Sequence, residues 1–80
     1  MKTVAYTHTA RRSFRKLPQD IRRQIEGKLS RYAKTGMGDV KHLAGQVGMR
    51  IRVGDYRAIF TESGAAIVVH AVGHRRDIYR

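Results

Sequence analysis

The sequence predicts an α+β protein in which an N-terminal strand and a helical hairpin pack on a mainly antiparallel sheet of about four strands. Two observations carry this prediction. Between residues 10 and 35 apolar residues recur at the spacing of an amphipathic helix, and from residue 49 onward they alternate with polar residues, as in half-buried strands. The 80 residues contain no cysteine, so one small domain, residues 1–80, is expected to fold without disulfides.

The first half of the chain predicts a short strand followed by two helices. Residues 2–6 are typical of a strand, and residues 10–17 carry one helical apolar stripe. Pro18 suits the first turn of a second helix, and Gly36 is a natural stop for it. The apolar stripe of the second helix comprises Ile21, Ile25, Leu29, Tyr32 and Ala33. Both stripes are expected to face the same sheet.

The second half predicts a loop and three strands. The glycine-rich loop, residues 36–48, is expected to anchor in the core through Leu43. Strands are expected at residues 49–53 and 56–61, joined by a two-residue type II′ turn at Gly54-Asp55. The most apolar strand, residues 65–72, is expected to be central. Gly73 should end that strand and a basic tail should follow it.

The charge of the chain is strongly positive. It has 17 lysines and arginines against 6 acids, a formal net charge of +11. Such an excess on a small surface favours polyanionic partners, either nucleic acid or an acidic protein. The longest apolar run, residues 65–69, cannot span a bilayer, and the first residues lack the apolar region of a signal peptide. A cytoplasmic protein without a membrane partner is therefore expected.

The predicted hairpin gathers three arginines on one face. With Gly54-Asp55 as its turn, Arg52 lies directly opposite Arg57, and Arg50 shares their side of the sheet. This arginine face (Arg50, Arg52 and Arg57) is opposite to the apolar one. Like charges placed opposite each other destabilise a sheet, and neither strand supplies an acid among them. The arginine face is therefore either a phosphate-binding site or, in the alternative reading, an ordinary solvated strand surface.

Other chemistry finds little support in the spacing of residues. The six acids are scattered, no two of them at the spacing of metal ligands, and the chain has no Walker loop for nucleotide phosphates. His70 is expected to be a half-buried strand residue. We therefore expect neither a metal nor another cofactor. The acid–base candidates near the arginines are His74 and Tyr79.

Four stretches together resemble a known family. They are MRIRVGDYRAIF at residues 49–60, VGHRRDIYR at 72–80, KLP at 16–18 and LAG at 43–45. In this order they resemble the RelE branch of the RelE/ParE toxin superfamily, over essentially the whole chain. The resemblance implies a RelE-like, microbial-ribonuclease-like fold and the toxin of a type II toxin–antitoxin pair.

The same resemblance implies an activity and its partners. RelE-type members enter the ribosomal A site and cut the mRNA there without a metal. The RNA 2′-hydroxyl attacks its neighbouring phosphate, which leaves a 2′,3′-cyclic phosphate and a 5′-hydroxyl. The implied partners are the ribosome, mRNA and a cognate acidic antitoxin, whose partly disordered segment would fold on this basic surface.

The catalytic pattern of the family carries over to particular arginines. Arg57 and Arg75 would be catalytic residues that hold the scissile phosphate and its developing charge. Arg50 and Arg52 stand where well-known relatives carry lysine. Because an arginine does not lose its proton in a protein, these two are expected to bind substrate phosphate and not to act as a base.

The general base is left open between two residues. The closing aromatic of the family pattern matches Tyr79, which would stack on a base or assist proton transfer. His74 is the alternative, because histidine titrates near neutral pH.

Two other functions share this fold or this charge. A ParE-like toxin would poison DNA gyrase by binding and would cleave no RNA, and fold alone does not distinguish it. A basic nucleic-acid-binding module without catalysis is the third possibility. The set that favours RNA cleavage comprises Arg50, Arg52, Arg57, Arg75 and Tyr79.

Overall fold

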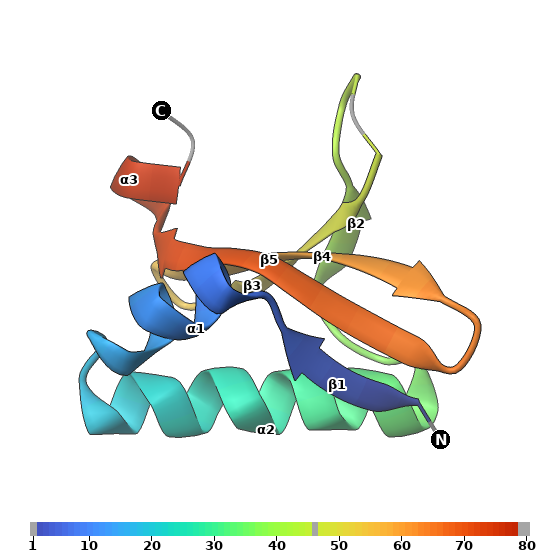
Figure 1. Cartoon of the computed structure of the whole chain (residues 1–80), viewed down its shortest axis with the longest axis horizontal. Coiled ribbons are helices and arrows are strands. Elements are labelled where there is room, and N and C mark those ends of the chain that lie inside the picture. The colour runs from blue at the N-terminus through green and yellow to red at the C-terminus, as the bar shows by residue number, and fades with distance from the viewer. Residues whose placement is uncertain (1, 46, 79–80) are drawn as a thin grey trace.

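The computed structural model describes residues 2–45 and 47–78, which form one five-stranded sheet with helices (Figure 1). The strand order is β1-β5-β4-β3-β2. β1 runs parallel to β5, and every other neighbouring pair is antiparallel. The predicted α+β class is therefore confirmed, with five strands in place of about four. The elements are β1 (Thr3–Tyr6), α1 (His8–Arg15), α2 (Gln19–Thr35), β2 (Val40–His42), β3 (Met49–Val53), β4 (Tyr56–Ser63), β5 (Ala66–His74) and α3 (Arg75–Ile78).

The ends of the two long helices follow from local capping. Thr7 caps α1 because its Oγ1 accepts a hydrogen bond from the Ala10 N–H at 3.1 Å, so the helix begins two residues earlier than predicted. Pro18 is the cap residue just before α2 and does not lie in its first turn. Gly36 ends α2 as predicted, and its N–H donates to the Tyr32 carbonyl. Among the described residues, no helix is long and apolar enough to cross a membrane.

The two long helices cover the same face of the sheet (Figure 1). In Figure 1, α1 and α2 lie beneath the sheet, whereas α3 and the loop between β2 and β3 rise on its other side. The buried core fills the space between the sheet and the two long helices, as the predicted apolar stripes require. It comprises Ala10, Ile25, Leu29, Ala33, Ile51, Val53, Ala58, Phe60, Ile67, Val69 and Val72.

The segment predicted as a loop contains a strand. β2 pairs with β3, and Val40 of β2 packs against the core. Leu43, the expected anchor, is only half-buried and is not part of the core cluster. The prediction failed because β2 has three residues, too few for an alternating pattern to stand out among glycines.

The last strand is longer than predicted. β5 continues through Gly73 to His74, and the expected basic tail begins as the short helix α3. His70 is exposed and not half-buried, and its Nε2 lies 2.8 Å from Thr61 Oγ1. The pairing of β4 with β5 shifts by one residue beside His70. Such a bulge turns a side chain out of the regular alternation.

A polar network beside the core connects α2 and β4 to Lys2, the residue before β1. The Tyr32 hydroxyl of α2 donates to the Glu62 carboxylate of β4, which also pairs with the ammonium group of Lys2. The hydrogen bond to Glu62 and burial raise the pKa of Tyr32 to about 12. The hydrogen bonds from Lys2 and Tyr32 lower the pKa of Glu62. The network therefore favours the charged carboxylate and the neutral phenol.

Candidate functional site

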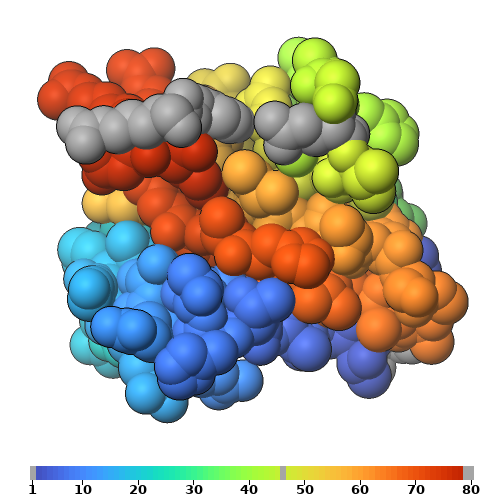
Figure 2. Space-filling model, turned by 45° about the horizontal axis from the view of Figure 1, so that its top comes forward, coloured from blue at the N-terminus to red at the C-terminus, as the bar shows by residue number. Residues whose placement is uncertain are grey.

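The arginine face lies on the side of the sheet that α1 and α2 leave open. Arg52 is the direct partner of Arg57 across β3 and β4, as predicted, and Arg50 lies two residues along β3 on the same face. Lys41 of β2 pairs with Arg50 and adds a fourth cation to this face. Sequence reasoning missed Lys41 because it did not predict β2. Figure 2 shows β4 and β5, in orange, between α3 in red and the segment before β3 in lime green.

Arg57 is the buried member of the arginine face. Its side chain lies over the hairpin turn and is only 9% exposed. Its Nη1 donates to the carbonyls of Gly54 at 2.7 Å and Tyr56 at 2.8 Å. Its Nε is buried and has no hydrogen-bond partner within the described residues. A buried charged donor without a partner is costly, so Arg57 retains the capacity to bind an anion.

Arg52 and Arg50 differ from Arg57 in exposure. Arg52 is exposed, and its Nη1 lies 3.9 Å from Oδ2 of Asp39. The expectation that no acid lies among the arginines holds for the two strands, but Asp39 reaches Arg52 from the turn before β2. Both side chains are more than half exposed, so this pair stabilises the fold little. Arg50 is half-buried and forms no ion pair among the described residues.

Arg75 joins the end of the sheet that bears Arg57. Gly73 of β5 is the direct partner of Arg57, and Arg75 follows two residues later as the first residue of α3. Its N–H donates to the Asp55 carbonyl at 2.8 Å, and its Nε lies 3.8 Å from Asp55 Oδ1. Arg57 and Arg75 therefore both contact the hairpin turn at residues 54–55.

The two candidate bases are placed differently from the arginines. His74 pairs with Tyr56, which packs against the core, so the register puts His74 on the face opposite to Arg57. Its ring lies edge-on to that of Tyr56, with centroids 5.4 Å apart, and its Nδ1 accepts a hydrogen bond from the Arg76 N–H at 3.1 Å. Tyr79 lies outside the described residues.

The model of the ParE toxin of the type II toxin–antitoxin system parDE matches residues 4–79. The chain belongs to the RelE/ParE toxin superfamily. This confirms the resemblance seen in the sequence. No curated protein sequence matches this toxin.

Solved structures of RelE toxins are similar to this toxin over nearly its full length. A RelB–RelE complex from Methanococcus jannaschii matches with 26% identity and a TM-score of 0.77, covering 94% of each chain. The RelBE2 complex from Mycobacterium tuberculosis matches with 28% identity and a TM-score of 0.79, covering 92% of this toxin and 98% of that chain. Isolated RelE from E. coli shares the fold, with 21% identity, a TM-score of 0.80, and 99% and 92% of the two chains covered.

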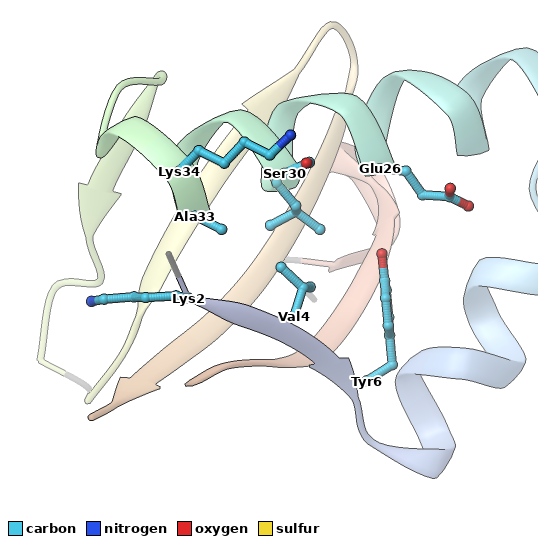
Figure 3. Close-up of a pocket in the computed structure, with 8 residues that line it drawn as sticks. Lys2, Val4, Tyr6, Glu26, Ser30, Ala33 and Lys34 are labelled. Carbon is cyan, nitrogen blue, oxygen red and sulfur yellow. The ribbon is translucent and has the colours of Figure 1, made fainter. Parts of the chain in front are cut away.

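A cavity of about 310 Å³ opens at the other edge of the toxin, between β1 and α2 (Figure 3). Its apolar wall is formed by Val4, Leu29 and Ala33, and lysines stand at one end. Burial raises the pKa of Tyr6, which lines the opposite end beside Glu26. No arginine of the arginine face lines this cavity. The arginine face is therefore separate from this cavity.

The described part of the toxin offers little to a metal ion. Within residues 2–45 and 47–78, no three His, Asp or Glu side chains gather closely enough to share one. The functional groups of the arginine face are cationic donors, which bind and stabilise negative charge.

Proposed function

We propose that this toxin is an endoribonuclease that cuts mRNA on the ribosome without a metal ion. The observation that carries the proposal is that Arg57 and Arg75 both contact the hairpin turn at residues 54–55, at one end of a cationic sheet face. A phosphodiester bound there would be held by planar guanidinium groups, which suit bidentate contacts to phosphate oxygens. The similarity to two RelE structures, with 26% and 28% sequence identity, also supports an endoribonuclease.

The main requirement of the proposed reaction is stabilisation of the negative charge that develops in its transition state. The RNA 2′-oxygen attacks the neighbouring phosphorus and loses its proton to a general base. We propose Tyr79 for this role over His74, because the register places His74 on the face opposite to Arg57. The bond from phosphorus to the 5′-oxygen breaks, and the leaving oxygen takes up a proton, which leaves a 2′,3′-cyclic phosphate and a 5′-hydroxyl. Negative charge grows on the phosphoryl oxygens during this step, so Arg57 and Arg75 would bind the transition state more tightly than the substrate.

The proposed partners follow from charge and from the relatives. We propose that a cognate acidic antitoxin neutralises the +11 surface, because two of the similar RelE structures are complexes with an antitoxin. The toxin would act in the cytoplasm, where ribosomes and mRNA are found.

A gyrase-poisoning function is the second candidate, because the matching family model is named for ParE. One experiment separates the two. Purified toxin is added to programmed ribosomes and, separately, to gyrase with relaxed plasmid. RNA cleavage that disappears when the scissile nucleotide carries 2′-deoxyribose supports the proposal. Loss of supercoiling with intact mRNA contradicts it, as does cleavage that survives the 2′-deoxy substitution.

A further inference from the structure

The Gly54-Asp55 turn contacts both arginines of the proposed phosphate site. Arg57 reaches it through Nη1, which donates to the Gly54 carbonyl. Arg75 reaches it twice, through its N–H on the Asp55 carbonyl at 2.8 Å and through its Nε, 3.8 Å from Asp55 Oδ1. One short turn is therefore the common support of two guanidinium groups that come from different elements, β4 and α3.

The carboxylate of Asp55 adds little to the stability of the fold. Its side chain is 69% exposed and that of Arg75 is 56% exposed, and an ion pair so open to water contributes little to folding. The same carboxylate should weaken substrate binding, because a negative charge beside a phosphate site repels the phosphate. A carboxylate at this place is useful if it restricts the Arg75 side chain.

We propose that Asp55 is a positioning residue that holds the Arg75 guanidinium toward the phosphate bound by Arg57. The proposal rests on the proposed function. Arginine has many rotamers, and fixing one of them before the reaction removes an entropic cost from the step in which charge develops. The backbone bond from Arg75 to Asp55 sets the start of α3, and the carboxylate then sets the direction of the side chain.

The proposal predicts that rate and affinity respond differently to Asp55→Asn. This change keeps a residue that suits turns and removes the charge. We expect the rate constant at saturating toxin, in single-turnover cleavage on programmed ribosomes, to fall about fivefold, the upper limit for an exposed ion pair. We expect the half-saturating concentration to stay equal or fall, because a repulsive charge is lost. Asp55→Glu keeps a carboxylate and should restore most of the rate.

Asp77→Asn is the matched control. Asp77 is an exposed acid of α3 that forms no ion pair among the described residues, so it tests the loss of one negative charge close to Arg75. Its rate constant should stay within about twofold of wild type, since an exposed charge that makes no ion pair with Arg75 acts mainly on encounter. An unchanged rate for Asp55→Asn, or an equal fall for Asp77→Asn, overturns the proposal.

A second measurement does not depend on cleavage. The Nε–H signals of Arg57 and Arg75 are followed by ¹⁵N NMR while inorganic phosphate is added to the whole toxin. In wild type both signals should shift with one dissociation constant, whereas in Asp55→Asn the two signals should shift with different dissociation constants. Separate titration in wild type overturns the positioning role, even if the toxin cleaves RNA. A toxin that fails to cleave but titrates in this coupled way overturns the proposed function and leaves the role of Asp55 standing.

Discussion

Arg57 differs from the other cations of the arginine face because part of its guanidinium is already bound. Nη1 serves two carbonyls of the turn, while Nε is buried without a partner in the described chain. A guanidinium has five donors in a fixed plane, so it can hold the turn and still offer an edge to an anion. An ammonium group in the same place has no second, rigidly oriented edge.

The arginines of the proposed site should matter far more than those of the helices. We expect Arg57→Ala and Arg75→Ala to lower the single-turnover rate constant on programmed ribosomes by about 10²–10³-fold each, the usual cost of removing a donor to developing charge. Arg57→Lys should lose nearly as much, because a lysine cannot keep the turn contacts and bind phosphate together.

The controls for these variants lie on helix surfaces. Arg11 and Arg23 are exposed on α1 and α2, and their replacement by alanine should weaken ribosome binding modestly with little change of the saturated rate. Arg22 is a poorer control because its Nε is buried. Circular dichroism must show each variant folded, since Arg57 lies within the sheet. Near wild-type rates for Arg57→Ala and Arg75→Ala would mean that the arginine face only docks the toxin.

The sequence predicts which residues share the arginine face but not how each side chain lies. A two-residue turn fixes the register of a hairpin, so Arg52 opposite Arg57 follows from Gly54-Asp55 alone. The folding back of Arg57 onto the turn depends on a choice among rotamers, which no pattern of residue types reveals. The approach of Asp39 depends on β2, which the sequence does not make visible.

Single glycines in the hairpin turn and in α2 should have opposite effects on stability. Gly54 has φ +61°, and Gly27 lies in the middle of α2; an added Cβ meets no atom within 4 Å at either position. Gly54→Ala should lower the free energy of unfolding by about 1–2 kcal/mol through backbone strain. Gly27→Ala should raise it by about 0.5–1 kcal/mol. Urea denaturation of both variants tests this, and a stabilising Gly54→Ala would contradict the turn geometry.

The network of Lys2, Tyr32 and Glu62 should make stability depend on pH. Because folding lowers the pKa of Glu62 from its ordinary value of 4.5, its contribution is complete above that value and is lost as the pH falls through the folded pKa. Folding raises the pKa of Tyr32 from 10.0 to about 12. The contribution of Tyr32 is therefore complete below pH 10 and is lost as the pH rises toward 12.

Replacing Glu62 tests the acid side of this dependence. Glu62→Gln should lower the free energy of unfolding at pH 7 by about 1 kcal/mol, a modest value because Lys2 is partly exposed. Denaturation at a series of pH values should show the gap to wild type narrowing below pH 4.5. Glu26→Gln, which removes an exposed acid of α2, should show no such trend. An equal gap at pH 3 and pH 7 would contradict the network.

Long periodic elements were predictable, and short or edge elements were not. The stripe of α2 buries Ile25, Leu29 and Ala33, as its 3.6-residue period requires. The sequence does not predict β2, because a three-residue strand is too short to show an alternating pattern and depends on β3 for its hydrogen bonds. The sequence predicts that Gly73 ends the last strand, but β5 pairs with β4 on both sides of this residue. Tertiary pairing here outweighs the weak preference of one glycine.

Half of the acids of the toxin lie beside cations that the structure places in the polar network or in the proposed site. Of its six acids, Glu62 pairs with Lys2, while Asp39 and Asp55 each stand near an arginine of the proposed site. Those two carboxylates offset some repulsion among the cations in the unbound toxin. A polyphosphate chain that binds there would replace them as the counter-charge.

RNA binding should therefore weaken steeply with salt. With about five phosphate contacts, from the cations of the open face and Arg75, affinity for single-stranded RNA should fall about 10²-fold between roughly 50 and 200 mM salt. Fluorescence anisotropy with an RNA blocked by 2′-deoxyribose measures this without cleavage. Arg52→Ala should make the salt dependence shallower by about one contact. A flat salt profile would contradict phosphate binding by this face.

The parallel pairing of β1 with β5 has a consequence for synthesis. Among the strands of the described residues, β1 is synthesised before the others, yet its sheet neighbour β5, at residues 66–74, is made after β2, β3 and β4. Domains fold as units as the chain emerges, and a contact between the earliest and the latest residues has the longest loop to close. The sheet that presents the arginines therefore cannot be completed on a nascent chain that still lacks β5. For the proposed function, this means that the complete arginine-bearing sheet forms only after residues 66–74 have left the ribosome.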